Sequence, residues 1–175
     1  METFNDVENL KPAHDAAAAL QVGQYRVLLG DELLNYRPVI IATPLPSGQQ
    51  VLEAAGVQPV LEHSVFQLLR NGQLESLRLD ETTDLHARGV EKFLIFHSDR
   101  SFRFELDGIA FEWGTDHIQG RVLKTLAKVD LPTYGVWQEV QGQDDREIGD
   151  GQFADLTPKG VERFFTGIVK TTEGS

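Results

Sequence analysis

Hydrophobic and polar residues alternate in a strand-like pattern along the stretch YRVLLGDELLNYRPVIIA, which begins at Tyr25. A turn at Gly30-Asp31 would fold Tyr25–Leu29 against the segment that runs to Ile41. The next stretch, PLPSGQQVLEAAGV, offers Ser47 as an N-cap, apolar residues at helical spacing and a final glycine as a stop signal. The pattern therefore predicts two strands followed by a helix of about two to three turns.

A hairpin is predicted in the segment VFQLLRNGQLESLRL, where Asn71-Gly72 separates two apolar stretches. The apolar stretch GVEKFLIF then supplies a last strand. The same order returns further along the chain. SFRFELDGIAFEWG contains a turn at Asp107-Gly108, IQGRVLKTLAKVD predicts a helix ended by Pro132, and YGVWQEVQG and GVERFFTGIV predict two more strands.

The elements recur because the sequence itself repeats. DLHARGVEKF at 84–93 returns as DLTPKGVERF at 155–164, a step of 71 residues. Two further blocks obey this step: Val65-Phe66-Gln67 returns as Val136-Trp137-Gln138, and Val51-Leu52 returns as Val122-Leu123. Self-similarity at a fixed step indicates two copies of one structural unit.

Each copy of about 75 residues has the order strand, strand, helix, strand, short strand, strand. This order is typical of the β-grasp, an α+β fold whose first and last strands lie parallel at the centre of the sheet. We expect two tandem β-grasp (ubiquitin-like) domains, at 23–98 and 99–170, joined by the short polar segment HSDRS. An N-terminal tail at 1–22 and an extended C-terminal tail at 171–175 would flank them. Each copy is near the lower size limit for folding on a hydrophobic core alone.

Charge and sequence composition exclude some classes of partner. The net charge is −11, with −7 in residues 1–99 and −4 in 100–175, so neither half carries the basic footprint of a nucleic-acid or anionic-membrane binder. A partner protein with a basic surface suits this acidic chain better than a nucleic acid or a membrane. The N-terminal sequence lacks the pattern of a targeting leader and no apolar run has the length of a membrane span, so we expect a cytoplasmic protein.

Candidate catalytic chemistry is absent from the sequence. Without cysteine, the chain has no thiolate metal site, no disulfide and no cysteine nucleophile. The five histidines show no metal-ligand spacing, the acidic clusters DETTD and QDDREIGDGQFAD fit solvated loops, and no serine lies in a nucleophile elbow. We therefore expect a protein that is not an enzyme, with no resident metal and no cofactor.

The segment FQLLRNGQLESLRLDETTDL resembles the third-to-fourth-strand region of ubiquitin. The tandem order, with GVEKF and GVERF before the last strands, is similar to the bacterial multi-ubiquitin family and, in architecture, to the interferon-induced tandem ubiquitin-like modifier of vertebrates. The resemblance implies a protein modifier with four partners: an activating enzyme that uses ATP, a conjugating enzyme, a metalloprotease-type deconjugase and a target protein. It also implies a role in bacterial antiphage defence.

The chain ends in IVKTTEGS, where Gly174 stands in place of ubiquitin's final two glycines and Ser175 follows it. A residue without a Cβ lets the backbone approach an enzyme's catalytic groups closely. We expect processing between Gly174 and Ser175, conjugation through the Gly174 carboxylate and recognition of the tail residues Lys170, Thr171, Thr172 and Glu173. Alternatively, Ser175 is an addition to the natural chain, or the whole ending is a functionless terminus.

The third strand of each copy carries apolar residues that belong either to the core or to a candidate partner patch on the surface. These residues are Phe66 and Leu68 in copy one and Trp137 in copy two. The alternation of residues does not decide which face of these strands is buried. Glu139 of copy two stands in register with Leu68, so the two patches differ if Leu68 points outward. The rival function is a non-conjugated adaptor whose two domains bind partners. A third possible function, that of an acidic hydrolase, is not supported by any catalytic arrangement of residues in the sequence.

Overall fold

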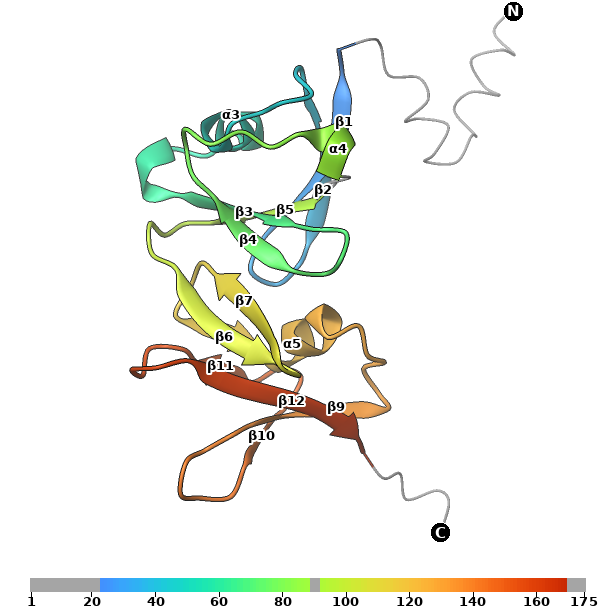
Figure 1. Ribbon diagram of the computed structural model, residues 1–175, viewed down its shortest axis with the longest axis vertical. Helices are drawn as coiled ribbons and strands as arrows, with labels where there is room; N and C mark the ends of the chain where they lie inside the picture. Colours follow the sequence, from blue (N-terminus) through green and yellow to red (C-terminus); the bar gives the residue numbers. More distant parts are fainter. Residues whose placement is uncertain (1–22, 89–91, 170–175) are drawn as a thin grey trace, which may run out of the picture.

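The computed structural model describes residues 23–88 and 92–169 (Figure 1). Copy one contains β1 (Tyr25–Gly30), β2 (Tyr36–Ile41), α3 (Gly48–Ala55), η1 (Val60–Glu62), β3 (Ser64–Leu68), β4 (Leu74–Leu77), α4 (Leu85–Arg88) and β5 (Lys92–Phe96). Copy two contains β6 (Phe102–Leu106), β7 (Ile109–Trp113), β8 (His117–Gln119), α5 (Gly120–Leu126), β9 (Tyr134–Gln138), β10 (Arg146–Ile148), β11 (Phe153–Asp155) and β12 (Glu162–Ile168).

Each copy has a five-stranded mixed sheet with the same strand order. The order is β2-β1-β5-β3-β4 in copy one and, read in the equivalent direction, β7-β6-β12-β9-β10 in copy two. The first and last strands are parallel neighbours at the centre of both sheets, as β1 and β5, and as β6 and β12. The predicted tandem β-grasp fold is confirmed.

Local signals account for helix α3 and for the tightest turn. Ser47 Oγ accepts a hydrogen bond from the Gln50 backbone N–H, and the Gln50 side chain accepts one from the Ser47 N–H, which makes a capping box. Gly56 closes the helix in the left-handed conformation, with φ 76°. Asp107 and Gly108 both have positive φ, 52° and 81°, as a two-residue hairpin turn requires.

The predicted second helix is too long at both ends. Ile118 belongs to β8 and pairs with Ala154 of β11, so the chain is extended there before α5 begins. At the other end the helix stops at Leu126, and Lys128 turns the chain with φ 61°, well before Pro132. The first turn also differs: Gly30 is the last residue of β1, and the turn follows it.

Copy one has a core between α3 and the inner face of its sheet. Its buried residues are Val27, Leu29, Ile41, Val51, Leu52, Ala55, Val65, Leu77, Leu85 and Phe93. The alternation of β3 decides which side chains join it, because Val65 points to this core and Phe66 points to the opposite face. The opposite face is covered by copy two.

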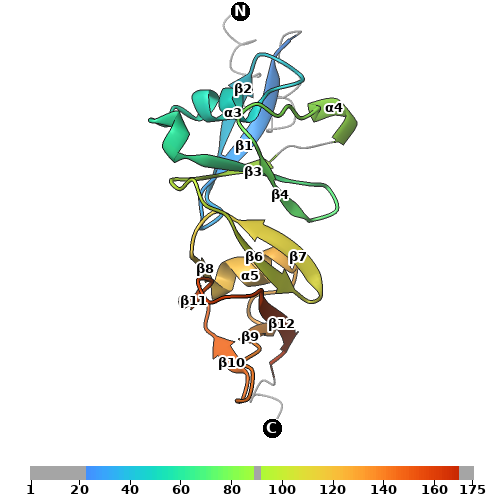
Figure 2. The same ribbon diagram turned by 60° about the vertical axis from the view of Figure 1, so that its left-hand side comes forward.

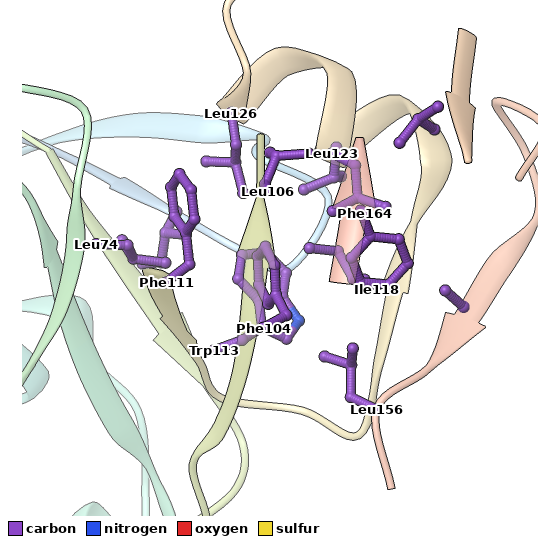
Figure 3. Close-up of a cluster of buried hydrophobic side chains, with 14 of the residues drawn as sticks. Leu74, Phe104, Leu106, Phe111, Trp113, Ile118, Leu123, Leu126, Leu156 and Phe164 are labelled. Atoms are coloured by element: carbon purple, nitrogen blue, oxygen red, sulfur yellow. The ribbon is translucent and has the colours of Figure 1, made fainter. Parts of the chain in front are cut away.

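One continuous apolar cluster joins the two copies. Leu74 of β4 lies beside Phe111 of β7 (Figure 3), and the two edge strands run next to each other in both views (Figures 1 and 2). Aromatic rings continue the contact inward: Phe96 packs edge-on against Trp113, with ring centroids 4.9 Å apart, and Trp113 packs against Phe104. The two domains therefore meet in a packed interior, while the linker HSDRS stays largely exposed.

Polar groups surround this apolar junction. Glu32 of the β1–β2 turn bonds to His117 Nε2 at 2.8 Å, and Arg121 donates to the Leu33 carbonyl oxygen at 3.3 Å. These contacts connect the turn of copy one to the start of α5 in copy two. Within the described ranges, no helix has the length and apolar character that a membrane crossing requires.

Candidate functional site

The last strand, β12, leads directly to the C-terminal tail. It lies at the centre of its sheet, parallel to β6 and antiparallel to β9. Two side-chain contacts fix its position, because the Asp107 carboxylate accepts hydrogen bonds from the Thr166 N–H and hydroxyl, both at 2.8 Å. The strand ends at Ile168, so the chain beyond it starts from a rigid support.

The residues predicted to carry the chemistry lie outside the described part of the chain. This holds for Gly174, Ser175 and the tail-recognition residues Lys170, Thr171, Thr172 and Glu173. Conjugation through Gly174 and processing after it therefore stay predictions.

Trp137 of β9 and Phe165 of β12 form a stacked pair on the outer face of the second sheet. The two residues are cross-strand partners, with ring centroids 5.7 Å apart and planes inclined by 15°. Both side chains are half-buried, whereas their neighbours Val136 and Phe164 are buried on the helix side. The alternation of these strands thus directs one aromatic pair away from the core.

Two glycines make room for the indole ring of Trp137. Gly135 and Gly167 are cross-strand partners, and a Cβ on Gly135 would lie 2.9 Å from Trp137 Cη2 and 3.0 Å from Val169 Cγ2. Val169, the first residue after β12, therefore covers the same spot as the indole. Its N–H donates to the Thr133 carbonyl oxygen at 2.9 Å, which holds the start of the tail beside the aromatic pair.

The other two residues of the candidate partner patch are placed differently. Phe66 is 1% exposed and packs against Phe96 in the junction, so the structure places it in the interior and not on a free surface. Leu68 is half-buried and packs against the same cluster. The two copies thus present different outer faces, because copy two covers that of copy one and leaves the Trp137–Phe165 pair accessible.

Sequence reasoning missed Phe165, Val169 and the two glycines of this site. A signal was available in the register, since an aromatic residue of a sheet can cover a glycine on its own face, as Trp137 covers Gly135 and Gly167. It could not be used because the pairing of β9 with β12 depends on contacts distant in sequence.

His117 is the most strongly engaged histidine in the described chain. Its Nδ1 bonds to Asp116 at 2.7 Å and its Nε2 to Glu32 at 2.8 Å. Desolvation acts to lower the pKa of His117, but the hydrogen bonds and charges of the two carboxylates outweigh it and raise the pKa above its ordinary value. Within the described residues, no three His, Asp or Glu side chains converge as metal ligands would.

Comparison with known families gives a match to each copy. The Multiubiquitin family matches residues 31–98 and again residues 102–167, which together make up more than half of the chain. Comparison with curated proteins finds no match. The first segment covers β2 to β5 of the first sheet and begins just after β1, and the second covers the strands of the second sheet, which has the same strand order. The chain therefore belongs to the multiubiquitin family, and its two copies are tandem ubiquitin-like domains.

Proposed function

We propose that this protein is a ubiquitin-like modifier, processed after Gly174 and conjugated through the Gly174 carboxylate to target proteins. The observation that carries the proposal is the arrangement of β12, a central strand of a ubiquitin-like sheet that leads straight into KTTEGS. Six residues extend to roughly 20 Å at the maximal span per residue, which is long enough for a tail to enter another protein's active site.

The Trp137–Phe165 pair supports this function through its position. It lies on the sheet face next to the start of the tail, where Val169 contacts the same glycine as the indole. An enzyme that binds the pair would hold the tail at a fixed distance from its own catalytic groups. Tail residues Lys170–Glu173 would then fill the channel that leads to those groups.

The partners follow from this role. A cognate activating enzyme would adenylate the Gly174 carboxylate with ATP, a conjugating enzyme would transfer it to the target, and a metalloprotease-type deconjugase would release it. A chain without cysteine suits the passenger in such a relay, because it offers a carboxylate and needs no nucleophile of its own. We place the system in bacterial antiphage defence and in the cytoplasm.

Co-expression with the cognate enzymes tests the proposal. Intact-mass and peptide mass spectrometry should find a target lysine or other acceptor joined to a modifier that ends at Gly174. If the chain binds the enzymes but forms no covalent adduct, it acts as the non-conjugated adaptor, with two β-grasp domains that serve as binding modules.

A further inference from the structure

A hollow of 370 Å³ lies at the junction of the two copies, between the β3–β4 turn, β5 and the end of α5. Its apolar lining comes from Leu34, Leu68, Leu126 and the ring of Tyr36, all of which belong to or pack on the junction cluster. The volume is within the range of about 300–1,000 Å³ that is usual for binding pockets. Apart from Leu68, none of the residues predicted for the modifier's site lines it.

The charge of this hollow is opposite to that of the molecule. Arg70, Lys92 and Lys128 line it, and none of its ten lining residues is acidic, although the chain has 27 acidic and 16 basic residues. All three side chains are exposed, and within residues 23–88 and 92–169 none of them has an ion-pair partner. Such clustering in an acidic protein favours an anionic occupant.

Two of the cations lie beside named neighbours in the hollow. The Lys92 ammonium lies 5.2 Å from the centroid of the Tyr36 ring, and burial, aided by the charge of Asp31, raises the pKa of Tyr36, so this ring stays neutral. Lys128 has a left-handed backbone, with φ 61°, and its ammonium lies beside Gly72.

We propose that the acidic segment at residues 2–10 of the same chain, ETFNDVENL, binds in this hollow. The segment lies outside the described residues. It contains three carboxylates, no basic residue and three large apolar side chains: Glu2, Asp6 and Glu8, with Phe4, Val7 and Leu10. The carboxylates match the three cations in number, and the apolar side chains match the lining of Leu34, Leu68, Leu126 and Tyr36.

The chain between this segment and the sheet is long enough. The described part begins at Gly23, and β1 then runs about 20 Å to Gly30, whose Cα position is covered by the ring of Tyr36 at the edge of the hollow. The residues at 11–22 span up to about 40 Å when extended. The segment therefore reaches the hollow from the far end of β1 without any change in the sheet.

A spin label tests this proposal on the full chain. Because the sequence has no cysteine, Thr3→Cys provides a single attachment site for a nitroxide. In the ¹⁵N-labelled protein, the amide signals of Gly72 and Lys128 should be lost, while that of Gly142, in the β9–β10 loop at the other end of copy two (Figure 1), should persist.

Matched variants separate specific binding from general attraction. Arg70→Gln, Lys92→Gln and Lys128→Gln together should restore the lost signals, whereas replacing three other exposed cations by glutamine, at Arg78, Arg103 and Lys159, should not. The proposal is overturned if the signals persist in the spin-labelled chain, or if the first triple variant still loses them. It is also overturned if the signals are lost to the same extent when a spin-labelled chain without ¹⁵N is mixed with a ¹⁵N-labelled chain without a spin label, since the segment that binds then belongs to another copy. None of these three outcomes bears on conjugation through Gly174.

Discussion

Gly48 and Gly120 begin the two helices at points where the backbone of a strand end leaves no space for a side chain. A Cβ on Gly48 would lie 2.3 Å from the Arg78 carbonyl oxygen, and one on Gly120 would lie 2.2 Å from the Gly149 carbonyl oxygen. In both copies this close approach accompanies a hydrogen bond from the glycine N–H: Gly48 donates to the Glu81 carbonyl oxygen beyond β4, and Gly120 to the Gln152 carbonyl oxygen beyond β10. The two helix starts thus share a packing constraint that requires glycine, although these glycines are 72 positions apart and not 71.

Replacing Gly120 by alanine should therefore destabilise the protein. The new methyl group meets backbone and not a movable side chain, so we expect a loss of about 1–3 kcal/mol in the free energy of unfolding, measured by urea denaturation. Gly151→Ala is the control, because a Cβ there would meet nothing within 4 Å. Equal stability of the two variants would contradict the geometry of the helix start.

His117 makes the contact between the copies dependent on pH. Its pKa is raised in the folded protein, so its contribution to stability is fully present below the unfolded pKa of about 6.5 and is lost as the pH rises through the folded pKa. NMR titration should give His117 a pKa above 6.5, and Glu32→Gln or Asp116→Asn should lower it. A pKa at or below 6.5 in the unmodified chain would show that the two carboxylates do not act on this ring.

At the scale of elements, β12 has two faces with different tasks. Phe164 is buried against the helix side of copy two, and Phe165 stacks on Trp137 on the outer face. Because adjacent residues of one strand serve the core and the surface, this strand both supports the fold and presents the proposed docking site.

Alanine at each position should separate these tasks. Phe164→Ala should cost about 3–5 kcal/mol of stability, as expected for a buried phenylalanine, and Phe165→Ala about 1 kcal/mol, the worth of one aromatic pair. We expect Phe165→Ala to weaken binding of the activating enzyme while the fold persists, as measured by calorimetry and circular dichroism. Unchanged binding by folded Phe165→Ala would remove the aromatic pair from the proposed site.

The elements that sequence predicts well are those with local causes. Capping by Ser47 and Gly56 and the turn at Asp107-Gly108 act within a few residues, so the pattern of strands and helices was predictable. The start of the second helix was not, because Ile118 becomes a strand residue by pairing with Ala154, 36 positions further on. In the same way, the burial of Phe66 depends on the placement of the other copy, which the sequence of one copy does not encode.

For the whole molecule, the aromatic contact at the junction joins two small domains into one unit. Rings from Phe66 through Phe96 and Trp113 to Phe104 form an unbroken series from the first sheet to the second. Domains of this size have limited cores of their own, so burial between them adds stability that each would lack alone. It also leaves the outer face of copy two, with the Trp137–Phe165 pair, uncovered by copy one.

Phe96→Ala tests this coupling. The side chain is 2% exposed and contacts both Phe66 and Trp113, so its removal should cost about 3–5 kcal/mol. In the unmodified chain, we expect amide hydrogen exchange to show both sheets opening with one common free energy, and Phe96→Ala should lower it in both. A loss confined to copy one would mean that the copies unfold independently.

The most direct test of the modifier function is the fate of Gly174 in the presence of the cognate enzymes. Mass spectrometry of the mature protein should find a C-terminus at Gly174, and Gly174→Val should abolish conjugation while leaving the unfolding free energy nearly unchanged, since added bulk would misplace the backbone in the enzyme's channel. Adducts formed by the Gly174→Val variant, or by chains that retain Ser175, would contradict conjugation through Gly174, and the absence of any adduct from the unmodified chain would leave the adaptor function in its place.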